Sequence, residues 1–183
     1  MVTKPDGSRA EAAEALRRVR GLLPRAMLRD AAEAAARMEA VARRAGGGGE
    51  GRRRALAELE GLIKKLEASA AERAQRAARR PAVRYPAELP IAGRAREIVQ
   101  AVGRRRAVIV SGETGCGKST QIPKMCLEAG RGVAGRIAVT QPRRIAAVTI
   151  AHRIAEELGE PLGRSVGYKI RFQDRAPRSA YIK

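Results

Sequence analysis

The sequence predicts an α/β fold, a parallel sheet with flanking helices, preceded by an α-helical hairpin extension. In the second half of the chain, short runs rich in Val and Ile alternate with longer amphipathic segments, an order typical of a parallel sheet with helices on its faces. In the first half, apolar residues recur every three or four positions, which is the helical period. We therefore expect a basic helical extension over 1–80, a proline-rich linker over 81–94 and the α/β part over 95–183.

Composition limits the partners that the chain can have. Its 183 residues suit one domain, or one domain with an extension. There are 38 Lys and Arg against 19 Asp and Glu, a formal charge of +19. This excess predicts attraction to a polyanion, with RNA, DNA or an anionic membrane as candidates. Since Ala and Arg are enriched throughout, a general compositional bias is the alternative explanation.

The two cysteines, Cys116 and Cys126, provide neither a disulfide framework nor metal-ligand spacing. No stretch approaches the roughly 20 apolar residues of a membrane span, and the first twenty residues lack the apolar core of a signal peptide. We expect a cytoplasmic protein without a membrane partner.

Two long helices are expected in the extension, over 24–45 and 52–80. The four glycines of 46–49 separate them, because a helix interior does not tolerate such a run cheaply. An antiparallel hairpin is the simplest assembly, and a loosely associated basic arm is the alternative. The apolar stripes are Leu28, Ala31, Ala35, Met38, Ala42 and Ala45 in the first helix, and Leu56, Leu59, Ile63, Leu66 and Ala70 in the second.

After the linker, the pattern alternates between helical and extended segments. Helices are expected over 95–104, 118–130 and 143–159, and strands over 107–111, 136–140 and 165–172, with a fourth strand beginning at 179.

The run SGETGCGKST at 111–120 satisfies GxxxxGK[ST], the pattern of a P-loop that cradles nucleotide phosphates. Glycines let the backbone turn its N–H groups inward, and the helix that follows adds its N-terminal dipole. Lys118 would reach the β- and γ-phosphates of ATP, Ser119 would ligate Mg²⁺, and Thr120 would contact the α-phosphate. The residues expected to hold the nucleotide here are Gly112, Glu113, Thr114, Gly115, Cys116, Gly117, Lys118, Ser119 and Thr120.

Cys116 occupies a slot in this loop that needs a small side chain. A filler of serine size is the simpler interpretation. A redox-sensitive thiol is the alternative, since a helix N-terminus lowers the pKa of a thiol.

The run TQPRR at 140–144 follows an expected strand and opens an expected helix, with Pro142 at the first helical position. There, Arg143 and Arg144 could bind a phosphate together with the helix dipole. A solvated basic helix start is the alternative.

Together, GETGCGKSTQIP, TQPRRIAAVTIAHRIAEELG and VGYKIRF resemble the DEAH-box RNA helicases, and YPAELPIAGRAREIV is similar to the bacterial HrpA type. The resemblance covers about residues 82 to 183. It implies a nucleoside-triphosphate hydrolase with two RecA-like domains that bind ATP and Mg²⁺ and translocate along RNA, with DNA as a second candidate. Residues 95–183 would then be the first part of one RecA-like P-loop domain, and the second RecA-like domain would be a partner. The oligomeric state is not indicated.

The resemblance also assigns residues. Arg153 matches an arginine that stacks on adenine, although by itself it reads as a surface arginine of a helix. The residues that match a motif touching the nucleic-acid backbone are Thr140, Gln141, Pro142, Arg143 and Arg144.

The acidic motif that names the family is not found. The only aspartates are Asp6, Asp30 and Asp174, and none follows an apolar strand and precedes Glu-Ala-His. We expect an N-terminal fragment that holds no catalytic residue, is inactive alone and is poorly stable. A naturally truncated ATP- and RNA-binding module without catalysis is the alternative. A different P-loop enzyme, such as a small-molecule kinase, is disfavoured by TQPRR.

Overall fold

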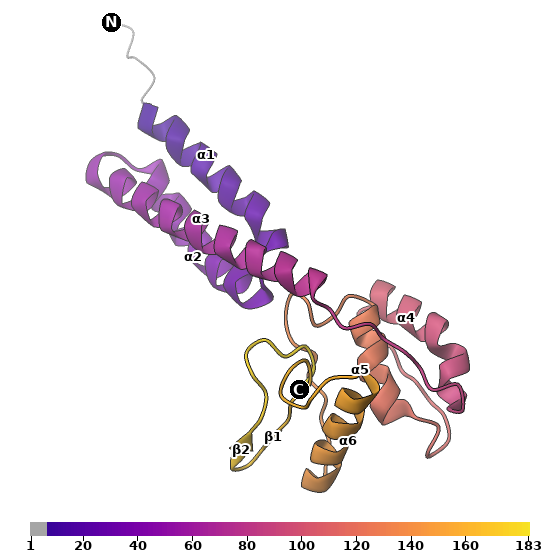
Figure 1. Cartoon of the computed structure of the whole chain (residues 1–183). Helices are drawn as coiled ribbons and strands as arrows, with labels where there is room; N and C mark the ends of the chain where they lie inside the picture. The colour runs from indigo at the N-terminus through magenta and orange to yellow at the C-terminus, as the bar shows by residue number, and fades with distance from the viewer. Residues whose placement is uncertain (1–6) are drawn as a thin grey trace, which may run out of the picture. The chain divides into compact units, whose positions relative to one another are not determined.

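The computed structural model describes residues 7–183, which form two compact units. The first unit ends at Gln75, and the second comprises Arg76–Lys183. Figure 1 shows the helices of both units along the chain.

The first unit consists of helices packed side by side. These are α1 (Gly7–Leu22), α2 (Leu28–Gly46) and the part of α3 (Gly49–Ala78) that ends at Gln75, with the short 3₁₀ turn Leu23–Arg25 between α1 and α2 (Figure 1). The break between α2 and α3 falls in the four-glycine run, as the sequence predicts. The predicted two-helix hairpin is nevertheless incomplete, because α1 packs against it through Ala12 and Val19, both of which are buried.

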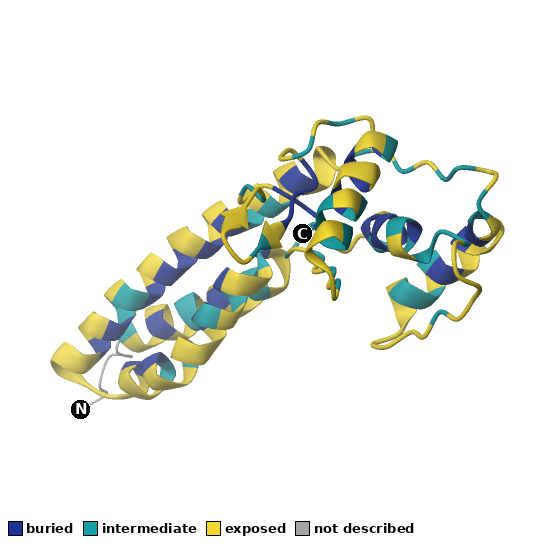
Figure 2. Ribbon diagram, turned by 90° about the horizontal axis from the view of Figure 1, so that it is seen from below, coloured by how far each residue is buried: buried dark blue, intermediate teal, exposed yellow. Residues whose placement is uncertain are grey.

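Small side chains make up much of this three-helix core, which appears in Figure 2 as dark stripes along the helices. The buried face of α2 differs from the predicted stripe, because Leu28 is 64% exposed and the buried residues include Ala34 and Val41. Alanines are so frequent in α2 that the period alone cannot fix the buried face. The buried apolar residues of the unit are Ala12, Val19, Ala26, Ala34, Val41, Ala45, Ala55, Leu59, Leu62, Ile63 and Leu66.

A buried polar contact joins α2 to α3. The Ser69 hydroxyl donates to Asp30 Oδ2 at 2.6 Å and accepts from the Met27 N–H at 2.9 Å. The hydrogen bond from Ser69 holds the pKa of Asp30 below its ordinary value. Two ion pairs between the same helices, Lys65–Glu33 and Arg44–Glu58, lie at the surface.

The second unit combines helices with a short antiparallel hairpin. Its elements are the 3₁₀ turn η2 (Pro90–Arg94), α4 (Ala95–Arg104), α5 (Lys118–Glu128), α6 (Arg144–Glu157), β1 (Lys169–Ile170) and β2 (Gln173–Asp174). Lys169 pairs with Asp174 and Ile170 with Gln173. The helix predicted over 95–104 is confirmed, and α5 and α6 end two residues before the predicted helices.

The predicted parallel sheet is wrong, and with it the RecA-like fold class. Within residues 7–183, only β1 and β2 form a sheet, and they are antiparallel. Among these described residues, parallel pairing is limited to isolated bridges of Ile182 with Ile137 and with Val166. The run 107–111 has no ladder partner in the described chain, and Ile109 is 96% exposed. An apolar β-branched run favours extended backbone, but a strand forms only when a neighbour supplies its hydrogen bonds.

Arg76 ties distant segments of the second unit together. Its guanidinium lies 4.5 Å from the centre of the Tyr181 ring, and the Tyr181 hydroxyl donates to the Arg76 carbonyl at 2.8 Å. A planar guanidinium can satisfy several carbonyls at once. The carbonyls that accept from it belong to Gly132, Val133, Ser179 and Ala180.

Over the described residues, no helix combines the length and apolar character needed to cross a membrane.

Candidate functional site

The loop of residues 111–117 leads into α5 through two glycines with left-handed backbone. Gly115 has φ +85° and Gly117, the N-cap of α5, has φ +96°. A Cβ at Gly117 would lie 3.1 Å from both Ile91 and Leu89 side-chain atoms. Both the dihedral and the close approach therefore require glycine at position 117.

This geometry leaves backbone donors free at the start of α5. Within the described chain, the N–H groups of Gly117, Lys118 and Ser119 donate to no backbone acceptor. The first turn of a helix has such unsatisfied donors by construction, and its dipole adds partial positive charge. The arrangement can bind an anion, phosphate in particular.

The Lys118 side chain folds back over the loop. Its Nζ donates to the carbonyls of Gly112 and Glu113, at 2.6 Å each, and lies 3.5 Å from Cys116 Sγ. A Cβ added at Gly112 would lie 3.3 Å from Cys116 Sγ and 4.0 Å from Lys118 Nζ. The ammonium group therefore lies against the loop.

A cavity of about 480 Å³ opens beside the loop, within the range of small-molecule sites. Its lining includes Gly112, Glu113, Cys116 and Lys118 of the loop. The other lining residues belong to η2, α4 and the run 108–111, and most of them are apolar.

Two hydroxyls follow the lysine and have different surroundings. Ser119 is exposed, and within residues 7–183 it shares no side-chain hydrogen bond. The Thr120 hydroxyl donates to the Gly117 carbonyl at 3.2 Å and accepts from Gln121 Nε2 at 2.9 Å. No group of three His, Cys, Asp or Glu side chains gathers in the described part of the chain, so Mg²⁺ here would depend on the Ser119 hydroxyl together with phosphate oxygens and water.

Thr114 lies exposed at the tip of the loop, and Glu113 is exposed beside Gly112. Cys116 is half-buried, and its carbonyl accepts from the Ile91 N–H at 3.3 Å. This contact ties the loop to η2.

The TQPRR segment is solvent-accessible. Thr140, Pro142, Arg143 and Arg144 are exposed and Gln141 is half-buried. The helix α6 begins at Arg144 with Arg143 as its N-cap, so the prediction that Pro142 is the first helical residue is wrong. Pro142 instead precedes the cap. In the described ion pairs, neither arginine has a carboxylate partner, so both guanidinium groups remain available to an anion.

The sequence did not point to a buried charged cluster that joins α5 to α6. Glu157 Oε2 accepts from Lys124 Nζ and, at 2.8 Å, from Gln121 Nε2. Glu157 Oε1 accepts from Arg153 Nε at 2.8 Å. The Lys124 side chain is 0% exposed and that of Glu157 is 8% exposed. One carboxylate therefore connects the expected adenine-contacting arginine with the helix that follows the loop.

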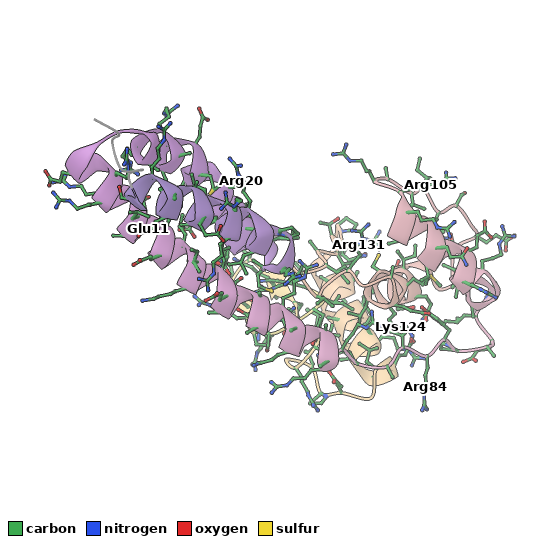
Figure 3. The ribbon with its side chains drawn as sticks, turned by 90° about the horizontal axis from the view of Figure 1, so that it is seen from above. Glu11, Arg20, Arg84, Arg105, Lys124 and Arg131 are labelled. Carbon is green, nitrogen blue, oxygen red and sulfur yellow. The ribbon has the colours of Figure 1, made fainter. Side chains whose placement is uncertain are left out.

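Lys124 has further partners. Its Nζ donates to the Arg84 carbonyl at 2.7 Å and lies 5.5 Å from the centre of the Tyr85 ring. Figure 3 labels Lys124 inside the unit and Arg84 with its side chain directed outward. Burial acts to raise the pKa of Glu157, but hydrogen bonds from Lys124, Gln121 and Arg153 outweigh it and hold the pKa below its ordinary value.

The orientation of the Gln121 amide follows from its neighbours. Its nitrogen faces the carboxylate of Glu157, which can only accept. The amide oxygen is buried and has no donor among residues 7–183. The sequence carries no clear signal for this cluster, because the helical neighbours of Lys124 three and four positions away are Thr120, Gln121, Leu127 and Glu128, a mixed set rather than an apolar face.

No protein-family model matches this chain. Individual proteins do. It is 43% identical over 122 residues to ATP-dependent RNA helicase HrpA of Escherichia coli (strain K12), an alignment that covers 67% of this chain and 9% of that protein.

Two further relatives agree with this match. The identity is 48% over 99 residues to an ATP-dependent RNA helicase HrpA homolog of Haemophilus influenzae, covering 54% of this chain and 8% of the relative. It is 45% over 101 residues to ATP-dependent DNA/RNA helicase DHX36 of Mus musculus, covering 52% and 10%. The chain thus spans about a tenth of the length of the curated relatives it matches.

Proposed function

We propose that this chain, which belongs to the DEAH-box ATP-dependent RNA helicases of the HrpA type, binds the triphosphate of Mg²⁺–ATP at residues 112–120. In the whole protein, ATP hydrolysis at this site would be coupled to translocation on RNA and to its unwinding. The names of the relatives support the use of ATP and of RNA.

The observation that carries the proposal is the set of free donors at the start of α5. Three consecutive N–H groups, those of Gly117, Lys118 and Ser119, lack backbone acceptors, and Lys118 Nζ lies against the same loop. A triphosphate needs several converging donors and positive charge. Lys118 would exchange the two carbonyls it now contacts for the β- and γ-phosphates.

The residues present fit Mg²⁺ in the way that P-loops use it. Mg²⁺ keeps several waters and takes few protein ligands when substrate phosphates supply the rest. The exposed Ser119 hydroxyl would be the protein ligand. The ion would neutralise charge on the phosphates, while this chain's own residues bind and orient them.

Arg153 would contact the adenine, and the exposed segment 140–144 would contact the nucleic-acid backbone. Phosphate contacts by exposed arginines position a strand without reading its sequence. Arg143 and Arg144, which lack carboxylate partners in the described ion pairs, suit this role. DNA would offer the same phosphates as RNA.

A second candidate function is a basic module that binds ATP and RNA without catalysis. The wide excess of positive charge favours it. An ATPase assay with single-stranded RNA separates the two, because the module would bind both ligands without turnover.

The nucleotide site is tested by calorimetric titration of the chain with Mg²⁺–ATP. Lys118→Ala should lower the affinity at least about tenfold, because it removes a charge-assisted contact to phosphate. The control is Lys169→Ala, which removes an exposed lysine of the same unit and should bind ATP as the wild type does. Equal affinity for wild type and Lys118→Ala would refute the assignment of the loop.

The nucleic-acid segment is tested by the salt dependence of RNA binding. Arg143→Ala combined with Arg144→Ala should reduce the slope of log K against log salt by about 1.4, at about 0.7 per phosphate contact on a single strand. Arg96→Ala combined with Arg178→Ala removes two other exposed arginines of the same unit and controls for the loss of net charge. An equal change of slope in both double variants would mean that segment 140–144 makes no special contact.

A further inference from the structure

The carboxylate of Glu157 is placed between two parts of the proposed nucleotide site. Its Oε1 holds Arg153, whose side chain is 56% exposed, while Oε2 holds Lys124 and Gln121 inside the unit. The ion pair between Lys124 and Glu157 is held in place, since the Lys124 side chain is 0% exposed. The interior contacts therefore anchor the carboxylate, and the anchored carboxylate orients an arginine at the surface.

The same cluster continues to the loop. Gln121 Nε2 donates both to Glu157 Oε2 and to the Thr120 hydroxyl, which in turn donates to the Gly117 carbonyl. Arg153, Glu157, Gln121 and Thr120 thus form one continuous chain of hydrogen bonds. It runs from the residue proposed at the base to the hydroxyl proposed at the α-phosphate.

From this geometry we propose that Glu157 is a positioning residue for the nucleotide site: it holds the Arg153 guanidinium ready for the base of ATP while its other oxygen stays locked in the interior. The inference rests on the proposed function. It extends that function by assigning base recognition to a carboxylate that does not touch the nucleotide.

The chemistry of this position requires a carboxylate. Glu157 faces three donors, from Arg153, Gln121 and Lys124, and an ionised carboxylate offers two oxygens that only accept. Glutamine would offer one oxygen and would turn an NH₂ group toward one of these donors. Aspartate would shorten the reach by one methylene. An i,i+4 ion pair at a half-exposed site adds little stability, so the contact to Arg153 acts by orientation.

The size of the effect follows from side-chain freedom. A long side chain that must be immobilised on binding costs roughly 0.5–1.5 kcal/mol, which corresponds to about a twofold to twelvefold change in affinity. If the contact with Glu157 already immobilises the Arg153 side chain before ATP binds, removing that contact should weaken ATP binding by about fivefold.

The test compares two ligands, ATP and inorganic tripolyphosphate, because only ATP carries a base. Both are titrated in Mg²⁺ into the full chain and into Glu157→Gln. We expect the ratio of ATP affinity to tripolyphosphate affinity to fall about fivefold. The control is Glu156→Gln, which changes the exposed neighbouring glutamate on the same helix and should leave the ratio unchanged.

A purely structural role would weaken both ligands equally or lower only the melting temperature, and either result would overturn the inference. Should Glu157→Gln fail to fold, Arg153→Met leaves the interior contacts of Glu157 in place and should lower the same ratio. When both variants fold, their effects on the ratio should not add, because they remove one contact. Additive effects, or an unchanged ratio in Arg153→Met, would count against Glu157. A wild-type chain that binds neither ligand would instead remove the proposed function itself.

Discussion

Replacing Lys124 by methionine isolates the buried charge at the centre of the α5–α6 contact. Methionine matches the apolar stem of lysine in length but lacks the terminal ammonium group. The variant loses the contacts of Nζ with Glu157 Oε2, with the Arg84 carbonyl at 2.7 Å and with the Tyr85 ring at 5.5 Å.

The magnitude follows from what stays behind. Removing one partner of a buried ion pair costs about 3–5 kcal/mol when the other charge is left without compensation. In Lys124→Met the charge of Glu157 is still compensated in part, because Arg153 and Gln121 continue to donate to its carboxylate. Methionine also avoids the cost of dehydrating an ammonium group. We therefore expect the free energy of unfolding to fall by about 2–3 kcal/mol.

Tyrosine fluorescence is the suitable assay, because the chain has no Trp and its three tyrosines lie at 85, 168 and 181, all in the second unit. Urea unfolding followed by this signal reports that unit alone. Lys169→Met is the matched control, since Lys169 is exposed, and it should cost less than about 0.5 kcal/mol. Equal losses in the two variants would refute the role given to Lys124.

The dependence on pH provides a second check. The pKa of Glu157 lies below its ordinary value of 4.5 in the folded state. A depressed carboxyl pKa contributes stability that is present above the unfolded value and is lost as the pH falls through the lower, folded value. The difference between wild type and Lys124→Met should therefore be full at pH 6 and shrink below about pH 4.5. A difference that is constant down to pH 2.5 would contradict the ion pair.

Three further predictions concern stability. Gly167→Ala would place a Cβ 2.5 Å from the Arg175 carbonyl oxygen. It should lower the free energy of unfolding of the second unit, followed by tyrosine fluorescence, by about 3 kcal/mol or more. The control is Gly103→Ala in α4, where an added Cβ would meet nothing within 4 Å, and this variant should be neutral or stabilising by up to about 1 kcal/mol. Ser69→Ala removes the donor to buried Asp30. It should lower the free energy of unfolding of the first unit by about 1–3 kcal/mol in urea unfolding followed by circular dichroism. Because the pKa of Asp30 is depressed in the folded state, this loss of stability should vanish as the pH falls below about 3.8. Arg76→Lys keeps the charge but not the planar fork, and it should cost about 2 kcal/mol or more by tyrosine fluorescence; a loss under 0.5 kcal/mol would mean that its carbonyl contacts are dispensable.

The sequence correctly predicted the elements that depend on residues close together along the chain. The helix over 95–104 and the break at 46–49 match the structure, because helical period and glycine runs act within a few residues. The left-handed glycines at 115 and 117 also follow from the motif. The phosphate and nucleic-acid roles of 112–120 and 140–144 remain predictions.

Predictions that needed partners from elsewhere in the chain were wrong. The run 107–111 has the composition of a buried strand, yet Ile109 is 96% exposed because no neighbour pairs with it in the described chain. The helical extension predicted over 1–80 includes the range of α1, but the two-helix hairpin leaves α1 out, because its buried residues Ala12 and Val19 are few and lie among charged residues. The apolar stripe predicts that Leu28 lies on the buried face of α2, but Leu28 is 64% exposed. In each case, tertiary packing rather than propensity decides burial.

The residues of the candidate site show the same difference between local and long-range causes. The left-handed glycines at 115 and 117 and the start of α5 at Lys118 were predictable because their causes lie within one turn of backbone. Glu157 was not, because its meaning depends on Lys124 and Gln121, 33 and 36 positions away. A lone glutamate near the end of a helix suggests only a solvated surface. The structure shows that one oxygen of Glu157 accepts from buried Lys124 and the other from Arg153 at the surface. Because the buried contact fixes the carboxylate, the second oxygen can orient the arginine.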